Sequence, residues 1–146
     1  MQDLQTLSVH PKLKFLAPFA IVGIAILFIY NIWSHGTIVN PGEAEYKVQC
    51  AQCHGDNGEG IKTLIPPLNH SDFAAKNFDS LPCWLKNGMN HPITVRDTVY
   101  DQPMYPNKNL DDVRTANVIN YMSTEFWGLD RQVNSGWVAQ KWKECK

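Results

Sequence analysis

The sequence predicts an all-α fold: an N-terminal transmembrane helix, then a small helical domain with one β-hairpin, and a C-terminal helical extension. Three observations predict it. Residues 15–33 form one long apolar run. Later segments show helical spacing of apolar residues and end at polar caps, prolines or glycines. Only residues 93–100 are strand-like. A chain of 146 residues suffices for one modest domain beside the anchor.

The apolar run predicts a membrane anchor. Residues 15–33, FLAPFAIVGIAILFIYNIW, carry no charge, and a spanning helix needs roughly 17 to 25 apolar residues. Lys12 and Lys14 flank its start, which places the N-terminus in the cytoplasm. The alternatives are a cleaved signal peptide, although no Ala-x-Ala pattern follows Trp33, and a buried core helix.

The anchor sets the expected organisation. We expect a cytoplasmic tail at residues 1–14, the anchor in the lipid bilayer at 15–33 and a linker at 34–41. A central domain at 42–128 and an extension docked on it at 129–146 complete the chain. The formal net charge is −1. No basic cluster is present to neutralise phosphates, so nucleic acid is not an expected partner.

The segment Cys50-Ala-Gln-Cys53-His54 matches the c-type haem attachment signal. Thiols three residues apart on a helical turn can reach the two vinyl groups on one porphyrin edge, and the adjacent imidazole points at the iron. The motif therefore predicts one covalently bound haem c with His54 as an iron ligand. A redox Cys-x-x-Cys would sit in a βαβ pattern, and a zinc site would need a second close pair of ligands. Neither is found in the sequence.

The flanking segments agree with this interpretation. Residues 41–49 predict a short helix with glutamates near its start. Residues 55–60, Gly-Asp-Asn-Gly-Glu-Gly, predict a glycine-rich loop whose backbone can pass close to the haem edge.

Three motifs together resemble class I cytochrome c: CAQCHGDNGEG, then Ile-Pro-Pro-Leu at 65–68, then Gln-Pro-Met-Tyr-Pro at 102–106. Residues 42–146 are particularly similar to small single-haem bacterial cytochromes. These carry a Leu-Pro-Cys segment, an Ile-Thr-Val hairpin before Gln-Pro-Met, and a terminal cysteine. The resemblance implies an electron carrier in which the helix at 113–127 crosses the helix that bears Tyr46.

The family pattern assigns the second iron ligand to Met104. The prolines at 103 and 106 would hold its segment stiff and extended. The resemblance also implies that a proline carbonyl accepts the other ring N–H of His54, with Pro66 the better candidate and Pro67 the alternative. The alternative iron ligands in the chain are Met89, Met122, His70 and His91.

Local signals predict the remaining elements. Residues 109–112 resemble a capping sequence for the helix at 113–127, and residues 80–88 predict a capped helix that ends at a glycine. Residues 93–100 predict a hairpin, although the central dipeptide, Arg96-Asp97, lacks glycine.

The two remaining cysteines form an even pair, which suits an oxidising compartment. In the tail helix predicted for 135–146, Val138, Trp142 and Cys145 share one face. That face would dock on the domain and bring Cys145 to Cys83 in a disulfide. The alternative is two buried thiols.

These observations together predict a carrier and not an enzyme, because both iron positions would be filled. We expect it in the bacterial inner membrane, single-pass, with the haem domain in the periplasm. The expected route runs from a quinol-oxidising complex to a terminal oxidase or reductase. The alternatives are a fixed subunit of a larger redox complex and, less favoured, a haem enzyme with a labile sixth ligand.

Overall fold

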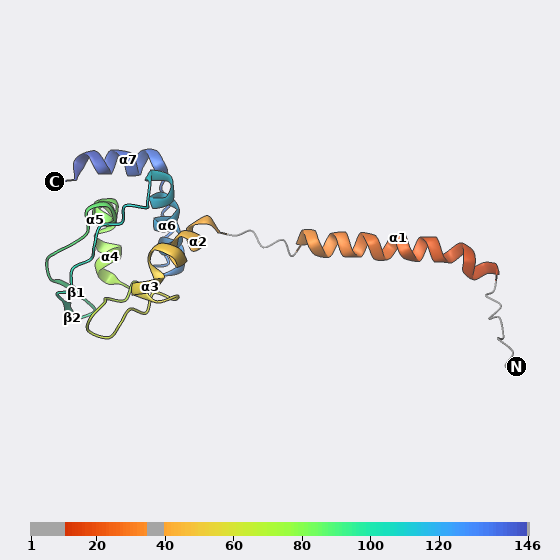
Figure 1. The fold of residues 1–146 in the computed structure, drawn as a ribbon, viewed down its shortest axis with the longest axis horizontal. Coiled ribbons are helices and arrows are strands. Elements are labelled where there is room, and N and C mark those ends of the chain that lie inside the picture. The colour runs from red at the N-terminus through yellow and green to blue at the C-terminus, as the bar shows by residue number, and fades with distance from the viewer. Residues whose placement is uncertain (1–10, 35–39, 146) are drawn as a thin grey trace, which may run out of the picture. The chain divides into compact units, whose positions relative to one another are not determined.

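The computed structural model describes residues 11–34 and 40–145, and the chain divides into two compact units, Met1–Ile38 and Val39–Lys146 (Figure 1). Most of the predicted tail, residues 1–10, and the middle of the predicted linker, residues 35–39, lie outside the described residues.

The first unit contains one helix, α1 (Pro11–Ser34), with Pro18 inside it. Among the described residues, no helix combines the length and the apolar character needed to cross a membrane. The predicted transmembrane anchor at 15–33 is therefore wrong, and so is the single-pass placement in the inner membrane. Pro18 and Asn31 both lie inside α1 and lower its apolar character.

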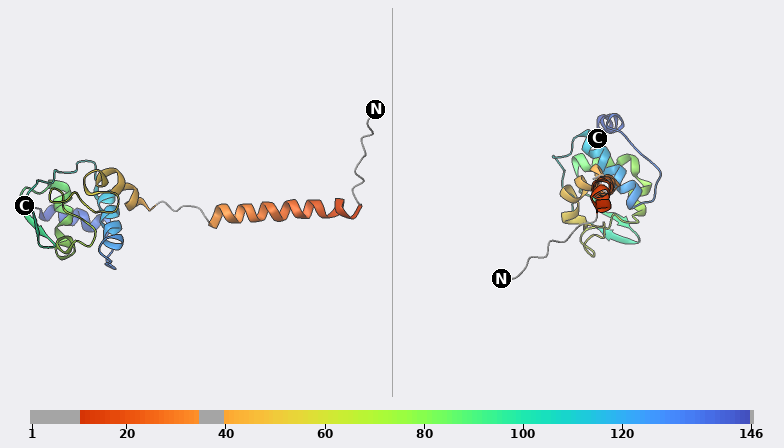
Figure 2. Two further views of the ribbon diagram at one scale, coloured as in Figure 1. Left: turned by 90° about the horizontal axis from the view of Figure 1, so that it is seen from below. Right: turned by 90° about the vertical axis from the view of Figure 1, so that its right-hand side faces the viewer.

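The second unit is mostly helical, with one hairpin at its side (Figures 1 and 2). Its elements, in chain order, are α2 (Pro41–Gln49), α3 (Ala51–His54), α4 (Asp72–Lys76), the 3₁₀ turn η1 (Phe78–Ser80), α5 (Leu81–Asn87), β1 (Ile93–Val95), β2 (Thr98–Tyr100), α6 (Asp112–Glu125) and α7 (Ser135–Glu144).

The crossing of α2 and α6 forms the centre of the core. Gly42 allows the close approach, since a Cβ there would lie 2.1 Å from the carbonyl oxygen of Asn117 on α6. One turn later the ring of Tyr46 is fully buried, with ring centroids 5.5 Å from Tyr121 and 5.1 Å from Phe126. The crossing that the family resemblance implied is confirmed.

The start of α6 differs from the prediction. The N-cap is Asp111, whose Oδ1 accepts a hydrogen bond from the Arg114 backbone N–H at 2.8 Å. The helix accordingly begins at Asp112 and ends at Glu125. Asn109, the first residue of the predicted capping sequence, instead contacts α2.

The predicted hairpin is confirmed, with β1 and β2 antiparallel and Val95 opposite Thr98. Arg96 and Asp97 take φ values of 48° and 63°, the left-handed geometry of a type I′ turn without its usual glycine. The carboxylate of Asp72, at the start of α4, accepts the Arg96 backbone N–H at 3.1 Å. This hydrogen bond from a neighbouring helix stabilises a turn that the dipeptide alone disfavours.

The C-terminal helix α7 packs on α5 and α6. Val138 is fully buried, and the Trp142 indole N–H donates to the carbonyl of Pro82 on α5 at 3.0 Å. In the structure Cys83 and Cys145 form a disulfide, with an S–S distance of 2.02 Å. The three residues predicted to share a face therefore all turn toward the rest of this unit.

Candidate functional site

One cavity of about 610 Å³ brings the predicted site residues together. Cys50, Cys53, His54, Pro66 and Met104 all line it. Apolar side chains from α4, α5, α6 and the hairpin complete the wall: Phe73, Leu81, Leu85, Val95, Tyr100 and Met122. The cavity is therefore apolar over much of its surface, with sulfur and imidazole groups placed along it.

The two site cysteines lie on a single helical turn. The backbone N–H groups of Cys53 and His54 donate to the Cys50 carbonyl at 3.1 and 2.9 Å. Both thiols are free. Burial, and to a smaller extent the neighbouring Cys53 and Glu45, raise the pKa of Cys50 to about 12. Cys50 and Cys53 would hold the haem through thioether bonds to its two vinyl groups.

His54 is held by one ring nitrogen, which leaves the other available. Its Nδ1 lies 3.0 Å from the carbonyl oxygen of Pro66, so this contact falls on Pro66 and not on Pro67. Burial lowers the pKa of His54, while the Pro66 carbonyl acts in the opposite direction. A neutral imidazole with Nδ1–H donated to a carbonyl presents Nε2 as a lone-pair donor, the form that ligates iron.

The loop after His54 is fixed from both sides. The Tyr46 hydroxyl donates to the Gly55 carbonyl at 2.7 Å, and the Gly60 N–H donates to the His54 carbonyl at 2.7 Å. Further along, the Trp127 indole N–H donates to the Leu68 carbonyl at 2.8 Å. The sequence does not reveal these carbonyl partners of Tyr46 and Trp127, because no local pattern connects them.

The segment bearing Met104 is tied to the end of α5. Met104 and Met89 exchange two backbone hydrogen bonds, each 2.8 Å long, and the Asn107 N–H donates to the Leu85 carbonyl at 2.9 Å. Gly88 makes room for the segment: its φ is 75°, and a Cβ there would lie 2.4 Å from the Met104 carbonyl oxygen. Met89 therefore serves this site through its backbone.

The alternative candidates for the iron ligand differ in whether they reach the cavity. Met89 and His91 line the same cavity, and Met122 is buried on α6 and also reaches it. His70 is exposed, and its backbone N–H donates to the Phe126 carbonyl at 2.8 Å.

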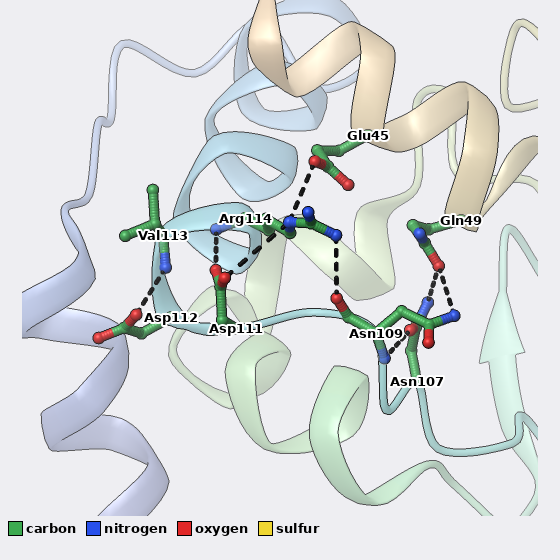
Figure 3. Close-up of polar contacts among 8 residues, drawn as sticks. All are labelled: Glu45, Gln49, Asn107, Asn109, Asp111, Asp112, Val113 and Arg114. Carbon is green, nitrogen blue, oxygen red and sulfur yellow. Dashed lines mark hydrogen bonds and ion pairs between the residues drawn. The ribbon is translucent and has the colours of Figure 1, made fainter.

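A polar cluster links the residues after Met104 to α2 (Figure 3). Gln49 Oε1 accepts hydrogen bonds from the side-chain amides of Asn107 and Asn109, at 3.2 and 3.3 Å. The donors lie 58 and 60 residues from Gln49 in the sequence. No periodicity or motif connects positions that far apart, so the sequence does not reveal this contact.

Two free thiols on one turn, an imidazole with one nitrogen engaged, and a thioether around one apolar cavity fit a covalently attached haem. They define the class of c-type haem proteins. A family model described as Cytochrome c matches residues 39–125. The chain belongs to the cytochrome c family and binds haem c covalently.

Two relatives agree with this assignment. Both are named Cytochrome c-552 and both come from Thermus thermophilus, the second from a specified strain of that species. Each is 33% identical over 94 residues, which cover 62% of this chain. The aligned part covers 71% of the first relative and 63% of the second.

Proposed function

We propose that this chain is a one-electron carrier with a single haem attached through Cys50 and Cys53 and ligated by His54 and Met104. Membership in the cytochrome c family supports electron transfer as the function. The observation that carries the finer proposal is that His54 and Met104 line the same cavity and that each is held by its own hydrogen bonds. Two protein ligands would leave the iron no open position for a substrate.

The bound haem supplies an iron that cycles between the ferric and ferrous states, and methionine ligation raises its potential. The chain's residues keep the ligands in place during that cycle. The Pro66 carbonyl fixes the ring orientation of His54 and raises its basicity. The paired backbone of Met89 and Met104 holds the sulfur-bearing segment. Electron transfer then needs little rearrangement of the protein.

For the route of the electron we propose a respiratory one, from a quinol-oxidising complex to a terminal oxidase or reductase. A carrier with both iron positions filled needs partners to deliver and remove its electron. Purification under mild conditions tests the route. Co-migration with subunits of such a complex supports the respiratory route. Co-migration with an unrelated dehydrogenase alone would reject this route.

The carrier proposal is tested by redox titration combined with carbon monoxide binding to the ferrous protein. We expect one reversible single-electron couple and no carbon monoxide complex, because Met104 occupies the sixth position. The Met104→Ala variant opens that position and should bind carbon monoxide readily. A wild-type protein that binds carbon monoxide as readily as this variant would overturn the proposal in favour of a ligand-binding haem site.

A further inference from the structure

We infer that Gln49 is a positioning residue for the sixth iron ligand: it ties the segment after Met104 to the helix that ends at the haem-attachment turn. This inference rests on the proposed ligation by Met104. Gln49 is the last residue of α2, directly before Cys50. A tie at this point connects the two sides of the haem site through a single side chain.

The contact is built from two donors and one acceptor. Gln49 Oε1 receives the Asn107 Nδ2–H at 3.2 Å and the Asn109 Nδ2–H at 3.3 Å. The Asn109 backbone N–H in turn donates to Asn107 Oδ1 at 3.0 Å. The three residues therefore form one closed set of contacts, visible between α2 and the loop in Figure 3.

Arg114 supports the same segment from α6. Its Nη1 donates to the Asn109 carbonyl at 3.4 Å, and its Nε lies 3.5 Å from Glu45 Oε1 on α2 (Figure 3). Residues 107–109 are thus held through side chains by Gln49 and through the backbone by Arg114. Both holding residues belong to the crossed helix pair of the core.

The segment from Met104 to Asn109 forms no helix, and hydrogen bonds hold it in place. These are the paired backbone of Met89 and Met104, the Asn107 N–H to the Leu85 carbonyl, and the contacts of Asn107 and Asn109 with Gln49. For Met104 to leave the iron, the chain next to it must swing outward. When residues 107–109 move outward with Met104, their hydrogen bonds to Gln49 break.

Imidazole displacement tests the inference on the haem-loaded ferric protein. Exogenous imidazole can bind the iron only after Met104 detaches, and the far-red sulfur–iron charge-transfer band reports how much Met104 remains bound. We expect Gln49→Ala to tighten the apparent imidazole affinity about 5- to 100-fold, the range for the loss of two net hydrogen bonds. Asn107→Ala should have a similar effect, and the double variant should show less than the product of the two, because the residues share one interaction.

Gln49→Glu is the conservative variant that distinguishes an effect on the position of the Met104 segment from an effect on the stability of the whole fold. A carboxylate still accepts both amide N–H groups, so imidazole affinity should stay near the wild-type value. Gln132→Ala is the matched control. It removes an exposed glutamine whose amide donates to Thr124 Oγ1 at 3.2 Å, and it should leave imidazole binding unchanged.

The possible outcomes test the role of Gln49 separately from the proposed ligation by Met104. A wild-type ferric protein without the far-red band would reject ligation by Met104, and the role of Gln49 with it. A wild-type protein with the band, together with a Gln49→Ala variant of unchanged imidazole affinity, would reject the role of Gln49 alone. An equal change in Gln132→Ala would also reject it, because the effect would then not belong to this contact.

Discussion

Gly88 is the residue on which the placement of Met104 depends most directly. Its φ of 75° lies in the left-handed region, and its Cα faces the Met104 carbonyl so closely that a Cβ would lie 2.4 Å away. Gly128 also has a positive φ, 60°, but a Cβ there would meet no atom within 4 Å. The two glycines therefore separate the cost of backbone conformation from the cost of a close contact.

We predict that Gly88→Ala lowers the free energy of unfolding by roughly 2–4 kcal/mol, combining left-handed strain with a clash against backbone. It should also weaken the far-red band, because the Met104 segment must shift. Gly128→Ala should cost only about 1–2 kcal/mol and leave the band intact. Denaturant unfolding and ferric absorption of both variants provide the measurement. Equal band loss in the two variants would contradict the assignment of this contact.

At the residue scale, the sequence reveals a shared role for residues that lie close together in the chain, and not for residues that lie far apart. Cys50, Cys53 and His54 fall on one helical turn, so their spacing alone reveals a shared role. The bond between Gln49 and Asn107 spans 58 residues, and neither residue type is unusual where it lies. Contacts of this kind arise from tertiary packing and leave no local pattern.

At the element scale, the crossing of α2 and α6 needs one residue without a side chain. A Cβ at Gly42 would lie 2.1 Å from the Asn117 carbonyl oxygen and 2.7 Å from Tyr121 Cβ. Both atoms belong to α6 and cannot rotate away. The interhelical distance would therefore have to increase.

We predict that Gly42→Ala destabilises the protein by about 1–3 kcal/mol, the usual cost of overpacking. Gly23→Ala is the control within another helix. A Cβ there would meet no atom within 4 Å, so we expect a change close to zero, or a small gain from helix propensity. Thermal unfolding of the haem-loaded proteins compares the two. A Gly42→Ala variant as stable as wild type would show that the crossing tolerates a wider separation.

The contact between α4 and the hairpin gives a prediction for pH. The Arg96 backbone N–H, and next the Lys76 side chain, lower the pKa of Asp72 below its ordinary 3.8. A lowered folded-state pKa means that the carboxylate stabilises the fold above pH 3.8 and loses this contribution as the pH falls through the folded value. Wild type should therefore be more stable than Asp72→Asn at neutral pH, and the difference should shrink below pH 3.8.

Denaturant unfolding of both proteins at several pH values measures that difference. Asp130→Asn, at another exposed aspartate, controls for the general effect of removing one negative charge. A difference between wild type and Asp72→Asn that stays constant down to low pH would refute the linkage.

Element boundaries were predictable where the signal was local. The stretch from Pro41 to Gln49 forms the expected helix because Asn40 Oδ1 caps it, accepting the Gly42 N–H at 2.9 Å. The start of α6 was not predictable, since Asn109 and Asp111 are both plausible N-cap residues in the sequence. The long-range contact of Asn109 with Gln49 leaves Asp111 as the cap.

At the scale of the whole molecule, several independent contacts join the C-terminal extension, residues 129–146, to the rest of the haem-bearing unit. Asn120 and Val133 exchange two hydrogen bonds, at 2.9 and 2.8 Å, and these fix the connection before α7. Arg131 lies over the Phe78 ring at 4.1 Å and pairs with Asp79. The disulfide then closes the C-terminal end onto α5.

We predict that replacing Cys83 and Cys145 together by serine lowers the free energy of unfolding by about 2–5 kcal/mol, as expected for a closed loop of this length. The haem spectrum should persist, because Asn120, Trp142 and Val138 still hold the tail. Wild type should show no free thiol under non-reducing conditions once haem is attached. Two reactive thiols in that assay would contradict the bridge.

The N-terminal helix shows where a sequence pattern can mislead at this scale. Residues 15–33 lack charge, and the absence of charge favours a membrane span. Charge is only one criterion, and among the residues that the structure describes no helix also meets the criteria of length and apolar character. The covalently bound haem was predictable because the Cys-x-x-Cys-His motif specifies a defined chemistry.

The central claim is that His54 and Met104 would be the two protein ligands of the haem iron. The most direct measurement is the far-red absorption of the ferric protein in three forms: wild type, Met104→Leu and Met89→Leu. Met89 holds the segment through its backbone, so its side chain can change without loss of those bonds. We predict the sulfur–iron band in wild type and in Met89→Leu, and its loss in Met104→Leu. A band that survives in Met104→Leu, or is missing from wild type, would contradict the claim.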